Sequence, residues 1–244
     1  MATQSRLPAF LLTRPAAQSH RFAAQLHQRF GPDITVTISP LLAPHYLEPP
    51  IPQGPFSALI FTSETGVVAF LAHPARPKDL PKLAYCVGER TAKAAQNAGL
   101  EPVSADGDAA NLILLIRQKG QRGPLLHICG KHTRGDVAQT LTDVRLPTQS
   151  CVLYDQIEQK LTKAAVALLR GEGAVMVPLF SPRSAGLFCK QVSALSLLSR
   201  PTYAVLSKAV GDSLSEVQNA NLCYAEKPTA ASLIDVIAQF YAVA

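Results

Sequence analysis

A repeated pattern along the chain restricts the folds it can adopt more than any other feature. A short apolar run is followed by a small or polar turn and then by an amphipathic stretch of helical period, and this unit recurs over nearly all of the 244 residues. The apolar run predicts a buried strand, and the stretch after it predicts a helix that can cross back over a sheet. The sequence therefore predicts an α/β fold built on parallel strands.

The expected elements follow from these runs and from the turn residues between them. Strands are predicted at residues 9–12, 34–38, 58–61, 83–87, 125–128, 150–156, 174–179, 203–206 and 222–225. Helices are predicted at residues 16–30, 64–71, 89–98, 111–118, 134–141, 160–169, 185–195, 210–218 and 230–241. Six prolines stand between residues 40 and 55, so this segment is predicted to be neither helix nor central strand and is the best candidate for a boundary.

Composition and charge exclude several classes of protein. With 48% hydrophobic and 16% charged residues, the chain can bury a core and is not expected to be disordered. The net charge of +6 is compatible with an anionic ligand. Because the basic residues are scattered and only 6% of the residues are aromatic, nucleic-acid binding is not expected.

The cysteines and histidines do not form a recognisable metal or disulfide pattern. The five cysteines are far apart with no C-x-x-C pair, so reduced, mostly buried thiols are expected. The six histidines have no metal-ligand spacing, and we therefore predict no metal; the lone His127, in a predicted strand, is interpreted as structural. No run approaches the roughly 18 apolar residues of a spanning helix, and the apolar patch at residues 7–12 is too short for a secretory segment. We expect a soluble, cytoplasmic protein without membrane contact.

The turns after the predicted strands are rich in Gly, Ser and Thr. In open α/β sheets, ligands bind beyond the carboxyl ends of the strands, where helix N-termini present free N–H groups. Such residues also serve as ordinary helix N-caps, and this interpretation remains open for each of them. Taken together, the turns predict an array of donors for a ligand that carries several carboxylates or phosphates. They cover residues 13–15, 62–66, 88–91, 130–134, 181–184 and 207–208.

Named nucleotide and hydrolase motifs are missing. The turn after the first strand reads Thr13-Arg14-Pro15 instead of a glycine-rich phosphate loop, and Gly130-Lys131 has no glycine five positions before it. No G-x-S-x-G elbow is present, which disfavours a nucleophilic serine hydrolase. A nucleotide-binding α/β enzyme with a degenerate loop is kept as an alternative.

The order and spacing of these turns resemble those of a known protein family over nearly the whole chain. The matching pieces are Leu11-Leu12-Thr13-Arg14-Pro15, Phe61-Thr62-Ser63, Val87-Gly88-Glu89-Arg90-Thr91-Ala92, Gly130 with Arg134, Val152-Leu153-Tyr154, Phe180-Ser181-Pro182-Arg183-Ser184-Ala185 and Pro228-Thr229-Ala230-Ala231. With them the chain resembles the uroporphyrinogen-III synthase family. It departs from the family pattern at Glu64 and around residues 205–210.

The resemblance implies two parallel-sheet α/β lobes of flavodoxin-like type, with the second lobe inserted in the first and an extended hinge of two segments between them. It places one lobe at residues 1–38 and 157–244 and the other at residues 44–148. Residues 39–43 and 149–156 become the hinge crossings. The first forty residues are too short to bury a core alone, and the returning chain supplies the missing strands.

The resemblance also implies a function, the cyclisation of hydroxymethylbilane to uroporphyrinogen III with loss of water and inversion of the last pyrrole ring. No cofactor is needed, and the partner is a linear tetrapyrrole polycarboxylate. Tyr154 is the expected acid for the departing hydroxyl, because a phenol is protonated at neutral pH. The residues expected to bind the substrate, largely through backbone N–H groups, are Arg14, Thr62, Ser63, Gly88, Thr91, Gly130, Arg134, Ser181, Ser207 and Lys208.

Two interpretations remain beside the enzyme. Tyr154 could instead be a hinge residue that packs one ring face against a lobe. The whole chain could be a two-lobed cytosolic protein that binds an anionic small molecule without chemistry. Nothing in the sequence indicates an exposed apolar helix seam, so we expect a monomer.

Overall fold

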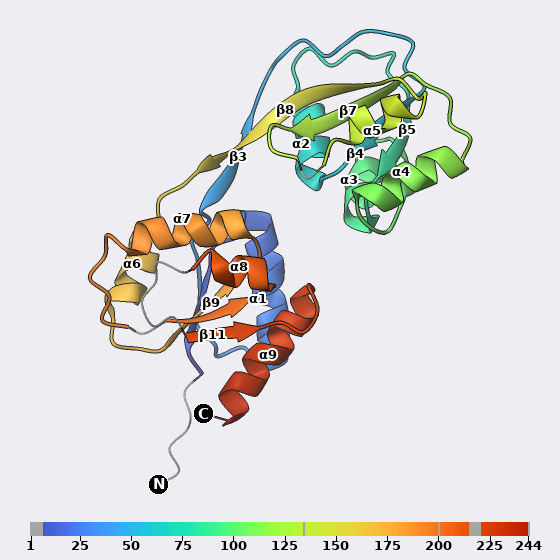
Figure 1. The fold of residues 1–244 in the computed structure, drawn as a ribbon. Coiled ribbons are helices and arrows are strands. Elements are labelled where there is room, and N and C mark those ends of the chain that lie inside the picture. The colour runs from blue at the N-terminus through green and yellow to red at the C-terminus, as the bar shows by residue number, and fades with distance from the viewer. Residues whose placement is uncertain (1–6, 134, 200, 215–220, 244) are drawn as a thin grey trace. The chain divides into compact units, whose positions relative to one another are not determined.

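The computed structural model describes residues 7–133, 135–199, 201–214 and 221–243. Its contacts divide the chain into two compact units. The first lobe consists of Met1–Ala43 with Ile157–Ala244, and the second lobe of Pro44–Gln156. The chain thus enters the first lobe, builds the second and returns to complete the first (Figure 1).

In the part of the first lobe that the structure describes, five strands form one sheet in the order β11-β10-β9-β1-β2. They are β1 (Ala9–Leu12), β2 (Val36–Ile38), β9 (Val175–Leu179), β10 (Thr202–Val205) and β11 (Asn221–Tyr224). Each neighbouring pair runs parallel. Numbered within the lobe, this is the 2-1-3-4-5 order of flavodoxin-like sheets.

Helices cover both faces of this sheet, because its strands are apolar on both sides. Side chains alternate along a strand, so Phe10 packs with α1 (Ala16–Phe30) and α9 (Ala230–Val243). Leu11, the next residue, packs in the opposite cluster. That cluster is formed with α6 (Lys163–Arg170), α7 (Pro182–Val192) and α8 (Lys208–Asp212).

The second sheet has the order β3-β8-β7-β4-β5-β6 among the described residues. The elements are β3 (Leu42–Tyr46), β4 (Ala58–Phe61), β5 (Leu83–Cys86), β6 (Glu101–Ser104), β7 (Leu125–Gly130) and β8 (Thr148–Glu158). From β8 through β6 the neighbouring strands run parallel. The predicted fold class, two mostly parallel α/β sheets, is confirmed.

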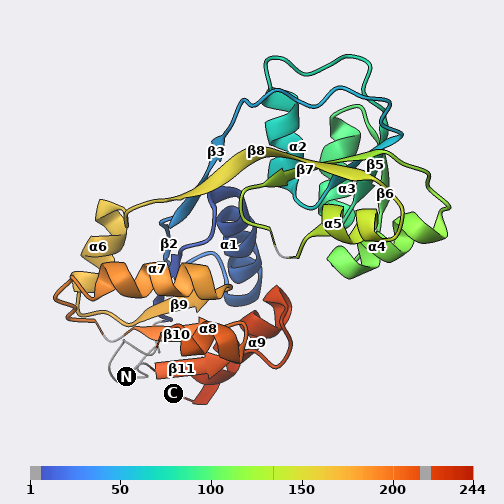
Figure 2. The ribbon, with the colours of Figure 1, turned by 45° about the horizontal axis from the view of Figure 1, so that its top comes forward.

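The second lobe is also covered on both faces. One face packs against α2 (Glu64–Ala72) and α3 (Glu89–Asn97). The other packs against α4 (Ala109–Gln118) and α5 (Val137–Asp143), as Figure 2 shows from a second direction. The turns after β4, β5 and β7 are therefore held by strands that are buried on both sides.

Two strands were not predicted, and both contain proline. The edge strand β3 includes Pro44, and β6 at the other edge of the same sheet includes Pro102. An edge strand tolerates proline because the missing N–H faces away from the ladder. Residues 149–156, expected to be a hinge crossing, lie in β8 and belong to the second unit.

Several predicted helix boundaries were wrong. The helix expected at residues 134–141 begins at Val137, where the Asp136 carboxylate caps the Gln139 N–H at 2.9 Å. The helix expected at residues 210–218 is the short α8, which ends at Asp212, while residues 215–220 lie outside the described chain.

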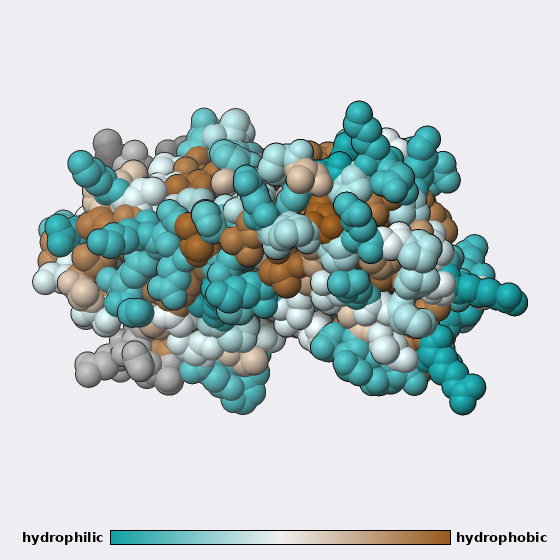
Figure 3. Space-filling view, turned by 90° about the horizontal axis from the view of Figure 1, so that it is seen from above, coloured by the Kyte–Doolittle hydropathy of each residue, from teal (hydrophilic) through white to brown (hydrophobic). Residues whose placement is uncertain are grey.

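The described surface is mixed in character. Figure 3 shows, on one face of the molecule, apolar areas interrupted by polar and charged side chains. No described helix is long and apolar enough to cross a membrane.

Candidate functional site

Tyr154 lies in β8, at an irregularity in its pairing with β7. Cys129 is opposite Val152, but the next residue, Gly130, is opposite Tyr154, so Leu153 is an extra residue on β8. Such a bulge changes the direction of a side chain. Leu153 and Tyr154 are consecutive yet both belong to the core cluster on the α2 and α3 face. The bulge therefore turns Tyr154 toward the N-terminus of α2.

Ser63 receives the tyrosine. It is the N-cap of α2, and its Oγ accepts the Gly66 N–H at 3.0 Å. The same Oγ lies 2.8 Å from the Tyr154 hydroxyl, and either oxygen can be the donor in this hydrogen bond. A serine hydroxyl has one proton and two lone pairs, so Ser63 can accept from the backbone and still donate to Tyr154.

Two glycines make room for this pair of hydroxyls. A Cβ added to Gly130 would lie 2.6 Å from Cζ of Tyr154 and 3.0 Å from its hydroxyl oxygen, so the ring lies directly on the glycine. A Cβ added to Gly66 would lie 3.3 Å from the carbonyl oxygen of Ile128, which shows how closely α2 approaches β7.

The buried setting keeps the Tyr154 phenol protonated. The side chain is 8% exposed. Burial raises the pKa of Tyr154 above its ordinary value of 10; the hydrogen bond to Ser63 opposes this, and the nearby Cys129 thiol adds to the increase. At neutral pH the phenol therefore holds a proton that it can donate.

Thr62, the first residue after β4, is hydrogen-bonded to a buried histidine. Its Oγ1 lies 3.3 Å from Nε2 of His127, which stands in β7 beside β4 and is 2% exposed. Burial lowers the pKa of His127 from 6.5 to about 4, and the charge of Asp136 only partly offsets this effect. The imidazole is neutral at physiological pH.

The remaining predicted residues of the second lobe lie at the same sheet edge. Gly88 is the N-cap of α3 and is half-buried, and an added Cβ there would meet nothing within 4 Å. Thr91, in the first turn of α3, is buried. Gly130 ends β7, and Arg134 lies outside the described residues. In parallel register the ends of β4, β5 and β7 are level, which brings Thr62, Gly88 and Gly130 to one edge.

A charged group in this lobe was missed by the sequence analysis. Lys131, directly after β7, and His132 both approach Asp155, at 3.4 Å and 3.5 Å. The Lys131 N–H also donates to the Tyr154 carbonyl oxygen at 2.9 Å. The segment after β7 is therefore held against β8 at Tyr154 and Asp155, although these residues are far from it in the sequence.

In the first lobe, Arg14 and Ser181 follow the neighbouring strands β1 and β9. The Arg14 guanidinium lies 3.9 Å from the ring centre of Phe180, and its Nε donates to Gln18 at 3.2 Å. Ser181 caps α7, where its Oγ accepts the Ser184 N–H at 3.2 Å. The structure thus places the Arg14 cation over the ring of Phe180. Phe180 directly precedes Ser181, the N-cap of α7.

Ser207 and Lys208 follow β10. Ser207 is the N-cap residue of the short α8 and is half-buried, and its side chain makes no capping hydrogen bond. Lys208 is 83% exposed and bonds to Asp212 at 2.8 Å and 3.0 Å. Its charge is thus partly matched within its own helix.

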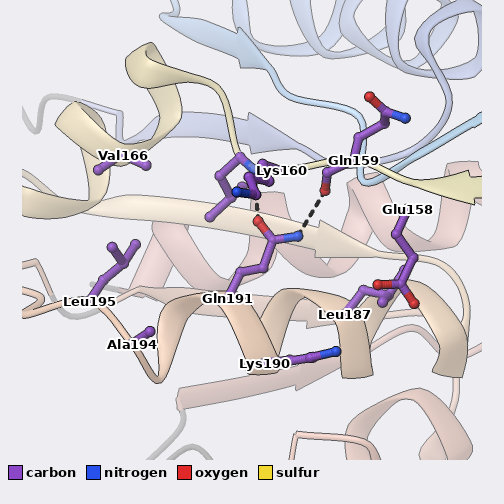
Figure 4. Close-up of a pocket in the computed structure, with 10 residues that line it drawn as sticks. Glu158, Gln159, Lys160, Val166, Leu187, Lys190, Gln191, Ala194 and Leu195 are labelled. Carbon is purple, nitrogen blue, oxygen red and sulfur yellow. Dashed lines mark hydrogen bonds between the residues drawn. The ribbon is translucent and has the colours of Figure 1, made fainter.

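A cavity of about 530 Å³ in the first lobe is lined by none of the predicted residues. Figure 4 shows Gln191 of α7 at this cavity, reaching the segment that follows β8. Its Nε2 donates to the Gln159 carbonyl at 2.8 Å, and its Oε1 accepts the Leu161 N–H at 2.7 Å. Gln191 therefore links the segment after β8 to α7, and it adds polar atoms to a cavity whose surface is otherwise largely apolar.

The thiols and potential metal ligands are dispersed. All five cysteines are free and buried. Among the described residues, no group of three or more His, Cys, Asp or Glu side chains could hold a metal ion.

Comparison with known proteins gives one family. The family model described as uroporphyrinogen-III synthase HemD matches residues 22–235. The crystal structure of uroporphyrinogen-III synthetase from Helicobacter pylori is similar with a TM-score of 0.63 and 17% identity, covering 96% of this chain and 99% of that one. A mutant uroporphyrinogen III synthase from Thermus thermophilus is similar with a TM-score of 0.50 and 14% identity, covering 95% and 97%. No curated protein matches the sequence.

Proposed function

The chain belongs to the uroporphyrinogen-III synthase family of cyclising lyases in tetrapyrrole synthesis, and on this premise we propose that Tyr154 and Ser63 form its proton-donating centre. The enzyme closes hydroxymethylbilane into uroporphyrinogen III with loss of water and inversion of the last pyrrole ring. The observation that carries the proposal is the 2.8 Å contact between the two hydroxyls, at a strand bulge beside a helix N-terminus.

The chemistry asks little of the protein besides positioning and one proton. The hydroxyl leaves from a carbon attached to an electron-rich pyrrole, whose nitrogen lone pair forms an azafulvene-type cation as the C–O bond breaks. The departing oxygen takes a proton and leaves as water. Because the last ring is inverted, its substituted α-carbon, which carries no hydrogen, first attacks the cation, and the bond from that carbon to its methylene bridge then breaks. The freed bridge carbon bonds to the unsubstituted α-carbon of the same ring, which releases a proton. Holding the bilane so that the correct carbon attacks is then the main catalytic contribution.

Tyr154 supplies the proton in this proposal. As the phenol O–H donates to the departing hydroxyl, negative charge develops on the tyrosine oxygen. Ser63 can turn its own O–H toward that oxygen while its Oγ keeps the Gly66 N–H, so the hydrogen bond strengthens as the charge grows. The positive end of the α2 dipole favours the same charge. A positioned acid of this kind contributes roughly 10²–10⁴ in rate.

This proposal changes the role of Ser63. Ser63 was expected to bind a substrate carboxylate, whereas its hydroxyl is hydrogen-bonded to Tyr154 and also accepts the Gly66 N–H. We assign carboxylate binding to main-chain N–H groups at Thr62, Gly88 and Gly130. For the first lobe we propose the same role for Ser181, Ser207, Arg14, and the exposed Lys208. Thr91, in the first turn of α3, is buried, so at this turn we assign the carboxylate contact to Gly88.

The test is the isomer formed from hydroxymethylbilane. Purified protein should give the type-III isomer in excess over the type-I product of spontaneous closure. Type-I product alone, formed at the rate seen without protein, would contradict the assignment. Ser63→Ala should retain type-III selectivity but lower kcat, since the substrate contacts remain while the phenolate loses its donor. Unchanged kcat in a folded Ser63→Ala variant would remove Ser63 from the proton-donating centre.

We further propose that the enzyme acts in the cytoplasm, as a monomer and without a cofactor. The free cysteines are compatible with a reducing compartment. Loss of water from the bilane transfers no electrons and no group to a carrier, so no cofactor is needed. Sedimentation should give a single species of 26.1 kDa that is fully active without additions. A dimer, or activity that is lost on dialysis and restored by a small molecule, would contradict this.

A further inference from the structure

The apolar surroundings of His127 do not explain why a histidine stands at this position of β7. It stands in the middle of β7, whose other residues are Leu125, Leu126, Ile128, Cys129 and Gly130, all buried. Burying a polar ring in such surroundings costs free energy unless it is hydrogen-bonded. A leucine or valine would fill this position at no such cost. The hydrogen bond that the ring makes therefore indicates what the histidine is for.

That bond goes to a residue of the proposed site. His127 pairs with Ile60 in the sheet, and Thr62, two residues beyond Ile60, turns its Oγ1 back to Nε2 of His127 at 3.3 Å. β4 and β7 lie side by side in the ribbon (Figure 1). Thr62 is half-buried, whereas His127 is closed off from solvent. The histidine thus holds the hydroxyl of a residue that is itself partly exposed.

Resting on the proposed function, we propose that His127 is a positioning residue that donates Nε2–H to Thr62 Oγ1 and so directs the Thr62 O–H toward a carboxylate of the bilane. The direction of the bond decides the chemistry. If Nε2 accepted, the Thr62 proton would point inward and only lone pairs would face an anionic substrate. If Nε2–H donates, the Thr62 proton is left for the substrate.

The charge state limits the ring to a single N–H, which the proposal places on Nε2. A neutral imidazole has one N–H, and both nitrogens would carry hydrogen only if the ring were protonated. Burial depresses the pKa of His127 to about 4, so the ring stays neutral over the working range. Asp136, at the N-cap of α5, is the charged group acting on it, and its carboxylate is already bonded to the Gln139 N–H. In the proposed tautomer the hydrogen is on Nε2, and Nδ1 carries none.

The kinetics of five variants test the inference. His127→Leu removes the donor, and Thr62→Val removes the hydroxyl at nearly equal volume. Each should raise KM about ten- to hundredfold, the range of a hydrogen bond to a charged group, with kcat little changed. The double variant should be no worse than either single one, since both remove the same contact. His127→Gln, whose amide can present an N–H near the position of Nε2, and Thr62→Ser should restore most of the wild-type KM.

Other results would overturn the inference. A purely structural histidine would give His127→Leu lower stability with unchanged KM, or KM effects that multiply in the double variant. Should His127→Leu fail to fold, Thr62→Val and His127→Gln still decide, because neither opens a large cavity. Independently of activity, ¹⁵N NMR of the free protein should show the Nε2–H tautomer, and the Nδ1–H tautomer would refute the proposal. If KM stays unchanged while Tyr154→Phe loses kcat, this inference fails and the proposed function stands.

Discussion

Gly130→Ala tests the packing that holds Tyr154 in place. The new Cβ would lie 2.6 Å from Cζ of the tyrosine ring, whereas ordinary contacts begin at 3.4 Å, so the ring must retreat by about 0.8 Å. Such a shift is large against the 2.8 Å hydrogen bond to Ser63. Overpacking of this kind costs about 1–3 kcal/mol of stability. A displacement near 1 Å can cost up to about 10²-fold in rate.

We expect Gly130→Ala to lower kcat at least about tenfold while the protein remains folded. The measurements are initial rates of type-III product, corrected for spontaneous closure, and urea unfolding followed by circular dichroism. Gly186→Ala is the matched control. Gly186 is an exposed position within α7 where an added Cβ meets nothing within 4 Å, so activity should be unchanged and stability slightly higher.

Two results would refute this reasoning. The first is a folded Gly130→Ala variant with wild-type kcat, which would mean that the ring position is irrelevant to turnover. The second is full additivity with Tyr154→Phe. If Gly130→Ala acts through the phenol, it should cost little further activity once the hydroxyl is gone.

Two further predictions concern stability and substrate binding. Because the pKa of His127 is depressed from 6.5 to about 4, the unfolded chain binds more protons between these values. The unfolding free energy should therefore fall by about 3 kcal/mol as pH drops from 7 to 4, and His127→Gln, measured by urea unfolding at each pH, should lack this component; an equal loss in both proteins would contradict it. Ser181→Ala should lower stability by about 1 kcal/mol through loss of the α7 cap, yet change KM less than threefold, because the main-chain N–H survives. A loss of activity beyond tenfold in folded Ser181→Ala would count against binding by backbone donors.

The fold was largely predictable because its elements obey simple local rules. Residues 16–30 form the helix α1 as predicted, since their apolar positions lie on one face and Gly31-Pro32 ends the run. The strands β3 and β6 were missed because each contains a proline, and the sequence does not show that both lie at sheet edges. The local sequence pattern indicates only whether a segment favours a strand or a helix. Whether a strand lies at the edge depends on how the whole sheet assembles.

The site was predictable only in part, for the same reason. The turns at Thr62, Gly88 and Gly130 could be found because they follow apolar runs. The bond between Ser63 and Tyr154 joins residues 91 positions apart and depends on the extra residue Leu153 in β8. The hydrophobic periodicity of the sequence does not indicate such a bulge. His127 was interpreted as structural because it is a lone histidine without metal-ligand spacing, and its partner Thr62, in the turn after β4, is 65 positions away in the sequence.

The most direct test of the proton-donating role is kcat for Tyr154→Phe. Phenylalanine keeps the ring on Gly130 and removes only the hydroxyl bonded to Ser63. We predict a folded protein that still binds hydroxymethylbilane but forms the type-III isomer at least about tenfold more slowly. Wild-type turnover by folded Tyr154→Phe would show that another group, or water, protonates the departing hydroxyl.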